Sequence, residues 1–134
     1  AKHDVDALSV QEAELSMKRR LGVSEEHLLI TQSNLANTYA RMGRLEEALQ
    51  MRRDVYSGRL KLNGDEDLAT IIAANNYALS LNELKRFEEA RSLLRRTMPV
   101  ARRALGDNND LTLRTRAIYA VALYKDAGAT LDDL

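Results

Sequence analysis

Apolar residues recur along this chain at the spacing of an α-helix, and short polar stretches separate the runs. Between residues 25 and 42, for example, Leu28, Leu35, Tyr39 and Met42 recur at intervals of three, four or seven residues, which places them on one helix face. The polar stretches hold glycines and acidic residues suited to ending one helix and capping the next. The pattern predicts helices at about 4–21, 25–42, 45–62, 67–84, 87–105 and 110–127.

The predicted helices repeat with a period of 42 residues. The matching positions are Asn34/Asn76, Ala36/Ala78, Glu46/Glu88, Glu47/Glu89 and Ala48/Ala90, and the glycine ladder Gly22, Gly64 and Gly106 keeps the same step. A partial third copy begins at Tyr119-Ala120. Several ladders that share one period indicate a repeat architecture. We therefore predict an all-α chain of helical hairpins, with each ladder glycine in the left-handed conformation that ends a helix.

The segment 34–48 resembles the core of the tetratricopeptide repeat, with Asn34-Leu35-Ala36, Tyr39, Gly43 and Glu47-Ala48 in the family's pattern. The 42-residue step is longer than the usual ~34 residues and is similar to the variant of kinesin light chains. This resemblance implies a right-handed superhelical solenoid of antiparallel helix hairpins. Paired helices are expected to approach closely at five small residues, Ala36, Ala48, Ala78, Ala90 and Ala120.

Other helical repeats fit less well. Armadillo repeats have a similar length but contain three helices, and this period has no room for a third. Pentatricopeptide repeats are shorter and usually occur in basic proteins, whereas the net charge here is zero.

The period divides the chain into repeats within one predicted domain, 1–134. We expect a half repeat at about 4–22, repeat one at about 25–64, repeat two at about 67–106 and a partial repeat at about 110–134. Leu131-Asp132-Asp133-Leu134 resembles the start of another second helix. Because both ends fall inside a repeat, the chain is expected to be a fragment of a longer array.

The resemblance implies a groove for an extended peptide, lined by the first helix of each repeat. Carried over by position, the predicted groove residues are Asn34, Asn37, Arg41, Asn75, Asn76, Asn82, Arg114, Val121, Tyr124 and Lys125. Asn is a poor helix former, so five of them on one helix face need a reason. An Asn amide can both donate to and accept from a peptide backbone.

Two interpretations of these asparagines stay open. Asn34 and Asn76 either hold a peptide backbone, as the kinesin-light-chain resemblance implies, or bond the neighbouring helix and stiffen the stack. Asn37 and Asn82 have no asparagine at the matching position of the other repeat, which favours contact with solvent or ligand.

The third copy has an apolar groove face, because Ile118 replaces the repeated asparagine and Ala117 and Val121 flank it. The charge on the face alternates from Arg41 to Glu83 to Lys125. We expect a peptide of mixed character, with one apolar side chain close to the third copy.

Arginines form a stripe on the predicted second helices, and residues 91–103 contain five arginines and no acid. A solvated outer face is the simpler interpretation, and a weak contact with phosphate or an acidic partner is the alternative.

Composition excludes several functions. With 20 basic and 20 acidic residues, the chain has no general field to attract nucleic acid or a membrane surface. It has no cysteine, its two histidines lack metal-ligand spacing, and no catalytic motif is present, so we expect neither an enzyme nor a bound cofactor or metal. The absence of a long apolar run and of a signal-peptide pattern favours a soluble, cytoplasmic protein.

We therefore hypothesise a scaffold that binds a peptide or partner segment in its concave groove. The alternative is a spacer or sensor array of a larger signalling protein, without a tight ligand of its own. The last helix lacks a partner helix, so Tyr119 and Leu123 should be partly exposed and favour self-association through the cut ends.

Overall fold

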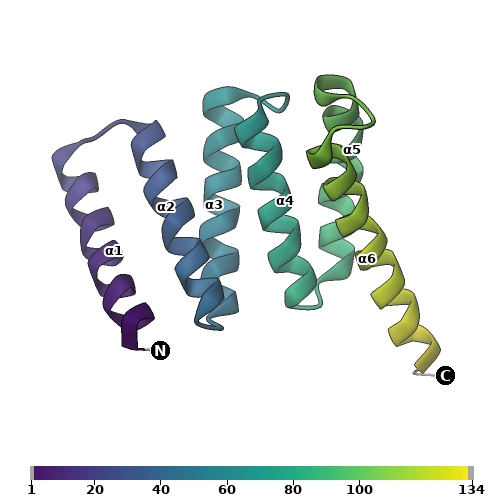
Figure 1. Cartoon of the computed structure of the whole chain (residues 1–134), viewed down its shortest axis with the longest axis horizontal. Helices are drawn as coiled ribbons and strands as arrows, with labels where there is room; N and C mark the ends of the chain where they lie inside the picture. The colour runs from purple at the N-terminus through teal and green to yellow at the C-terminus, as the bar shows by residue number, and fades with distance from the viewer. Residues whose placement is uncertain (1, 133–134) are drawn as a thin grey trace. The chain divides into compact units, whose positions relative to one another are not determined.

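The computed structural model describes the backbone of residues 2–132 and the side chains of 3–126. Its elements are α1 (Lys2–Leu21), α2 (Glu25–Arg41), α3 (Leu45–Asn63), α4 (Leu68–Glu83), α5 (Phe87–Leu105) and α6 (Asp110–Asp132) (Figure 1). The described residues contain no strand, so the all-α helical repeat is confirmed. The handedness of the superhelix stays a prediction.

The helix boundaries lie within two residues of the predicted ones everywhere except at the end of α6. That helix runs to Asp132 without a break, so the expectation of a new helix beginning at Leu131 is wrong. In the two earlier repeats the first helix ends in a turn at Gly43 and at Lys85, both in the left-handed region. The matching position in the third copy, 42 residues after Lys85, is Ala127. Alanine disfavours that conformation, which is consistent with a helix that continues. Residues 133 and 134 lie outside the described part.

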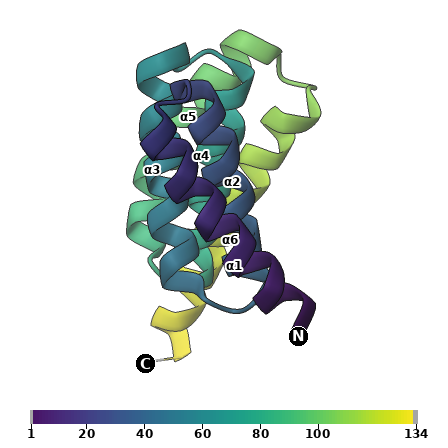
Figure 2. The same ribbon diagram turned by 90° about the vertical axis from the view of Figure 1, so that its left-hand side faces the viewer.

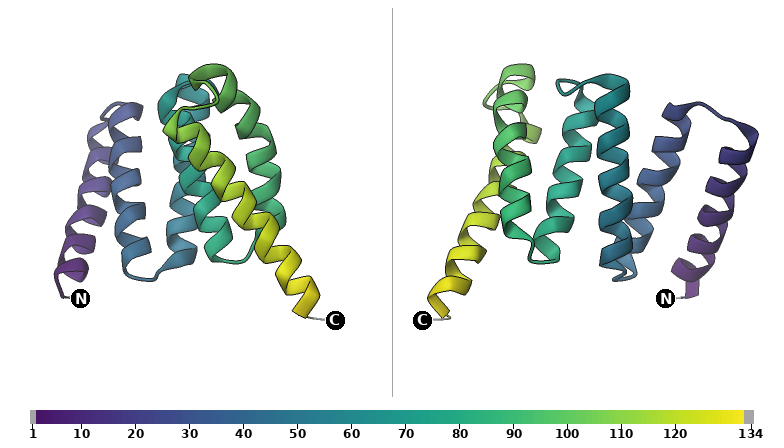
Figure 3. Two further views of the ribbon diagram at one scale, coloured as in Figure 1. Left: turned by 45° about the vertical axis from the view of Figure 1, so that its right-hand side comes forward. Right: turned by 180° about the vertical axis from the view of Figure 1, so that it is seen from behind.

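The chain forms two compact units, of which the first holds α1–α3 and the second α4–α6. Consecutive helices run antiparallel within each unit: α1 beside α2 is seen in Figure 2, and α5 beside α6 in Figure 3. Each unit thus contains the helical hairpin that the 42-residue period predicts. The assignment of a single domain that begins and ends inside a repeat stays a prediction.

Polar side chains cap the helices that begin each hairpin. Ser24 Oγ accepts from the His27 N–H at 3.3 Å, and Asp67 Oδ1 accepts from the Ala69 N–H at 2.9 Å. Asn109 Oδ1 accepts from the Leu111 N–H at 2.8 Å. Each cap satisfies a backbone donor that has no partner in the first helical turn. Asp67 and Asn109 are one period apart and Ser24 lies one residue from the matching position, so the three helices start at nearly the same place with similar caps.

The short turns inside the two hairpins have the same backbone shape but different residues. Gly43 joins α2 to α3 at φ 76°, and Lys85 joins α4 to α5 at φ 60°. Glycine adopts this left-handed conformation freely, whereas a residue with a Cβ atom is strained by about 1–2 kcal/mol there. The second hairpin therefore turns at a residue poorly suited to its conformation.

Replacing Lys85 by glycine should raise the free energy of unfolding by about 0.5–1 kcal/mol, because relief of this strain exceeds the added entropy of the unfolded chain. Urea denaturation followed by circular dichroism measures the change. Lys85→Ala is the matched control, since it removes the same side chain but keeps a Cβ atom, and it should give no gain. Equal stability of the two variants would show that the turn is not strained.

The core of the first unit joins all three helices. Its cluster of buried residues consists of Leu8, Leu15, Leu35, Tyr39 and Ala48. The Arg44 guanidinium lies over the Tyr39 ring, 4.9 Å from its centroid, and burial together with the Glu12 carboxylate raises the pKa of Tyr39. On α3, a Cβ atom placed on Gly58 would lie 2.5 Å from Leu29 Cδ2, so α2 and α3 approach as closely as a glycine allows.

In the second unit, small residues are buried where helices meet. Ala78 and Ala90 are fully buried, as are Ala36 and Ala48 in the first unit, so four of the five alanines are buried as close approach of the helices requires. The fifth, Ala120, is exposed, because α6 continues past it without turning into a second helix that would cover it.

The outer side of α6 is partly uncovered, as its missing partner predicts. Tyr119 is half-buried and Leu123 is exposed. The last turns of α6 run past the end of α5 (Figures 1 and 3). Self-association through this face stays a prediction.

Candidate functional site

A hollow of about 270 Å³ lies between α4 and α6. It is lined by Leu79, Asn82, Glu83, Arg114, Ala117, Ile118, Val121 and Lys125. The sequence places all of these residues on the predicted inner face of a first helix. The aliphatic side chains of Leu79, Ile118 and Val121 make the hollow apolar, and an acidic and two basic residues add charge. This is the chemistry expected of a binding site for an apolar side chain flanked by polar groups.

A second hollow, of about 290 Å³, lies along the N-terminal half of α4. It is lined by Leu68, Ile72, Asn75, Asn76, Asn109, Asp110, Leu111 and Arg114. Both hollows share Arg114, and together they occupy the space between α4 and α6, here named the α4–α6 groove. The spacing of the periodic residues did not indicate Leu68 or residues 109–111, because they belong to helix starts and to the loop before α6.

Two of the predicted groove asparagines connect the helices. Asn75 is 2% exposed, and its Oδ1 accepts a hydrogen bond from Thr115 Oγ1 at 2.9 Å. Asn82 is 7% exposed, and its Nδ2 donates to the Ile118 carbonyl at 3.2 Å. The Asn82 amide thus donates to α6 rather than to solvent, because α6 packs on this side of α4, and its contact with a ligand stays a prediction.

Each of these amides keeps one buried atom without a partner. Within the described residues, Asn75 Nδ2 and Asn82 Oδ1 make no hydrogen bond. Leaving such an atom unpaired costs about 1–3 kcal/mol. Both residues line the α4–α6 groove, which gives the groove one spare donor and one spare acceptor close to its surface.

Asn34 and Asn76, the repeated pair, do not connect helices within their units. Asn34 is exposed and Asn76 is half-buried, and neither side chain has a hydrogen-bond partner within its own described unit. Asn37 is exposed, and its Oδ1 accepts from Arg52 Nη2 of α3 at 3.3 Å. Arg41 is exposed as well, with its Nε 3.6 Å from Asp4 Oδ1. On α2, the predicted residues thus lie on an open polar surface.

Of the predicted groove residues on α6, three line the α4–α6 groove and one does not. Arg114, Val121 and Lys125 line the first hollow, and their part in binding a peptide stays a prediction. Tyr124 is 80% exposed but lines neither hollow, so the structure does not bring it into the α4–α6 groove.

Acidic and histidine side chains do not gather into a metal site: no group of three or more lies together among the residues that the structure describes. None of the described helices is long and apolar enough to cross a membrane.

Comparisons with known proteins point to one repeat family. Two family models, each described as tetratricopeptide repeat, match residues 28–68 and 69–129. Among solved structures, BtubC (BKLC) from P. vanneervenii superposes with a TM-score of 0.79 at 20% sequence identity. The match covers 92% of this chain and 49% of BtubC, so the chain spans about half the length of that protein. No curated protein matches the chain significantly.

Proposed function

This chain belongs to the tetratricopeptide repeat family, in the 42-residue form that resembles kinesin light chains, and we propose that it binds an extended peptide segment of a partner protein in the α4–α6 groove. Repeats of this family are generally protein–protein interaction modules. Our proposal that the ligand is a peptide, and that it binds in this groove, is based on the surface between α4 and α6.

The observation that carries the proposal is the apolar surface inside the groove. Leu79 of α4 and Val121 of α6 both line the first hollow and remain 38% and 41% exposed, while Ile72 is 42% exposed in the neighbouring hollow. Apolar side chains gathered in a concave surface favour a ligand that covers them. An apolar side chain of a bound peptide would remove this surface from water.

The dimensions of the groove suit an extended chain. The 16 residues of α4 span about 24 Å at ~1.5 Å per residue. An extended peptide advances about 3.3 Å per residue, so roughly seven residues cover this length. Asn76, half-buried and without a partner in its unit, lies in the groove where it can bond a peptide backbone.

Charges around the hollow favour a peptide of mixed character. Glu83 lies on one side, and Arg114 and Lys125 lie on α6. A strongly acidic or strongly basic segment would meet at least one charge of its own sign, which is unfavourable. The preferred ligand is therefore a segment with a large apolar residue and charges of both signs beside it.

The groove is tested with Leu79→Gln/Val121→Gln. Twelve-residue peptides are first selected from a random display library with the full chain, and their affinities are measured by fluorescence polarisation. Losing two apolar contacts of about 1 kcal/mol each should weaken binding roughly tenfold or more. Leu60→Gln/Leu113→Gln is the matched control, because it makes the same chemical change at exposed leucines that line neither hollow. It should leave the affinity unchanged.

The groove would be rejected if both double variants bound the selected peptides as tightly as the unchanged chain. A library that yields no peptide at all would instead favour the spacer or sensor array without a tight ligand. Circular dichroism of both variants shows whether the helices are retained.

A further inference from the structure

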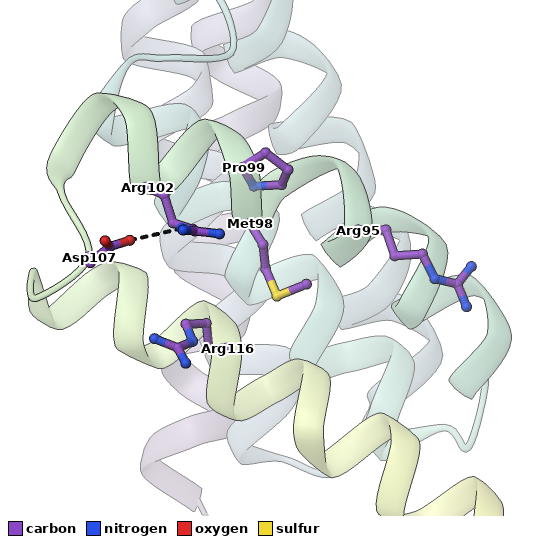
Figure 4. Close-up of a pocket in the computed structure, with 6 residues that line it drawn as sticks. All are labelled: Arg95, Met98, Pro99, Arg102, Asp107 and Arg116. Atoms are coloured by element: carbon purple, nitrogen blue, oxygen red, sulfur yellow. Dashed lines mark hydrogen bonds and ion pairs between the residues drawn. The ribbon is translucent and has the colours of Figure 1, made fainter.

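A third hollow, of about 430 Å³, lies on a different surface of the second unit, between α5 and the first turns of α6. It is lined by Arg95, Met98, Pro99, Arg102, Asp107 and Arg116 (Figure 4). None of these residues lines the α4–α6 groove. Whatever binds here is therefore separate from a peptide in that groove.

The hollow carries two positive charges that are not neutralised. Arg102 Nε forms an ion pair with Asp107 Oδ1 at 2.8 Å, which accounts for one arginine. Arg95 Nε donates to the Tyr119 hydroxyl at 3.4 Å, a neutral and weak partner. Arg116 is exposed and has no ion-pair partner among the side chains that the structure describes. Arginine that is not paired internally is well suited to bind carboxylates.

Two other arginines of α5, Arg91 and Arg103, are already paired and do not belong to this surface. Arg91 bonds Glu88 and Asp126, which raises its pKa, and Arg103 Nε pairs with Glu66 Oε1 at 2.8 Å. The charges of Arg91 and Arg103 are thus neutralised by neighbouring acidic side chains. Arg95 and Arg116 are left available beside the hollow.

The charges are separated by an apolar surface. Arg95 and Arg102 are two turns apart on α5, about 10 Å along the helix axis. Met98 and Pro99 lie between them, while Arg102, Arg116 and Asp107 gather at one end and Arg95 points away at the other (Figure 4). A single phosphate group is only a few ångströms wide and would meet one end. Four residues of an extended peptide span about 13 Å, place the two end side chains on the same face and reach both ends.

Pro99 lies inside α5 and lines the hollow. Because proline has no N–H, the Arg95 carbonyl cannot accept the usual helical hydrogen bond from residue 99. The proline ring and the thioether of Met98 offer an adaptable apolar contact beside it.

We propose that this surface, the basic hollow, is a second docking site, and that it binds an acidic peptide segment of a partner protein. The segment has two carboxylates four residues apart, one reaching Arg95 and the other Arg116, with a large apolar residue midway between them on Met98 and Pro99. In an extended chain these three side chains face the same side. A scaffold with such a site holds two partner segments at once.

The test is an NMR titration of the ¹⁵N-labelled full chain with the blocked peptide Ac-GSDSLSDSG-NH2. Its expected result is a set of shifts confined to the α5 residues around Met98 and to the α6 residues around Arg116. Arg95→Gln/Arg116→Gln should weaken binding about tenfold, because both carboxylates lose their partners. Arg20→Gln/Arg96→Gln removes the same charge at exposed arginines outside the hollow and should change affinity less than twofold.

Three results would overturn the proposal. One is equal binding of a peptide with Asn in place of both Asp residues, and another is an equal loss in the two double variants. The third is tighter binding of a neutral peptide with a single phosphoserine, which would assign the surface to phosphate. Leu79→Gln/Val121→Gln should not change this binding, so the basic hollow and the α4–α6 groove are tested independently.

Discussion

Gly58→Val is expected to lower the free energy of unfolding by about 3 kcal/mol, since overpacking a filled core costs about 1–3 kcal/mol and a β-branched side chain adds further clashes. A Cβ atom at this position lies 2.5 Å from Leu29 Cδ2 and 3.3 Å from Cδ1. Leu29 is only 1% exposed, so it has no free space to move into. The loss therefore exceeds the roughly 1 kcal/mol that replacing a helical glycine usually gains. Chemical denaturation measures the difference.

A neighbouring residue provides the control for this prediction. Ser57→Val introduces the same side chain at an exposed position of α3 and should change stability by no more than about 0.5 kcal/mol. A double-mutant cycle with Leu29→Ala then tests the contact itself, because valine at position 58 should fill part of the cavity. Additive effects in that cycle would show that the two residues do not compete for one space.

Thr115→Val should destabilise the chain by about 2 kcal/mol, because it leaves a buried amide without a partner at nearly constant side-chain volume. The Thr115 hydroxyl donates to Asn75 Oδ1 at 2.9 Å and lies 2.9 Å from the Leu111 carbonyl of its own helix. Asn75 Nδ2 has no partner among the described residues either, so the variant would leave the whole buried amide unbonded. Thermal unfolding and urea denaturation both report the change.

Thr115→Ser separates the hydroxyl from the methyl group. It keeps the donor and removes one buried methyl, so it should cost only about 1 kcal/mol. If serine and valine at this position destabilised the chain equally, the hydrogen bond to Asn75 would contribute nothing beyond packing. The comparison also shows how firmly α6 is held against α4, and thus how well preserved the α4–α6 groove is in solution.

The sequence was sufficient to predict the helices because two kinds of signal agreed at almost every boundary. Apolar spacing marked each helix, and residues such as Ser24, Asp67 and Gly106 marked its ends. At the end of α6 the signals conflicted: Leu131-Asp132 looked like a helix start, but no suitable turn residue stood at position 127. Residues that resemble the start of a new helix therefore do not end the preceding helix when no turn residue comes before them.

The candidate site was predicted less completely, for a geometric reason. Helical spacing shows which residues share a broad face, and the residues that line the first hollow were found that way. It does not resolve the ~100° rotation between neighbours such as Asn75 and Asn76. The structure does resolve it: Asn75 is turned into the contact with α6, while Asn76 stays half-buried in the groove. The arginine stripe of residues 91–103 was evident in the sequence, but the basic hollow was not, because its residues come from one helix, a loop and the next helix.

The different turn residues of the two hairpins have a consequence for engineering. A concatemer made from copies of residues 25–66 would place glycine at each hairpin turn, whereas one made from 67–108 would repeat the lysine of position 85. Because repeat stabilities add nearly linearly along an array, a penalty of about 1 kcal/mol at one turn would be multiplied by the number of copies. The first hairpin is therefore the better template for a long synthetic array.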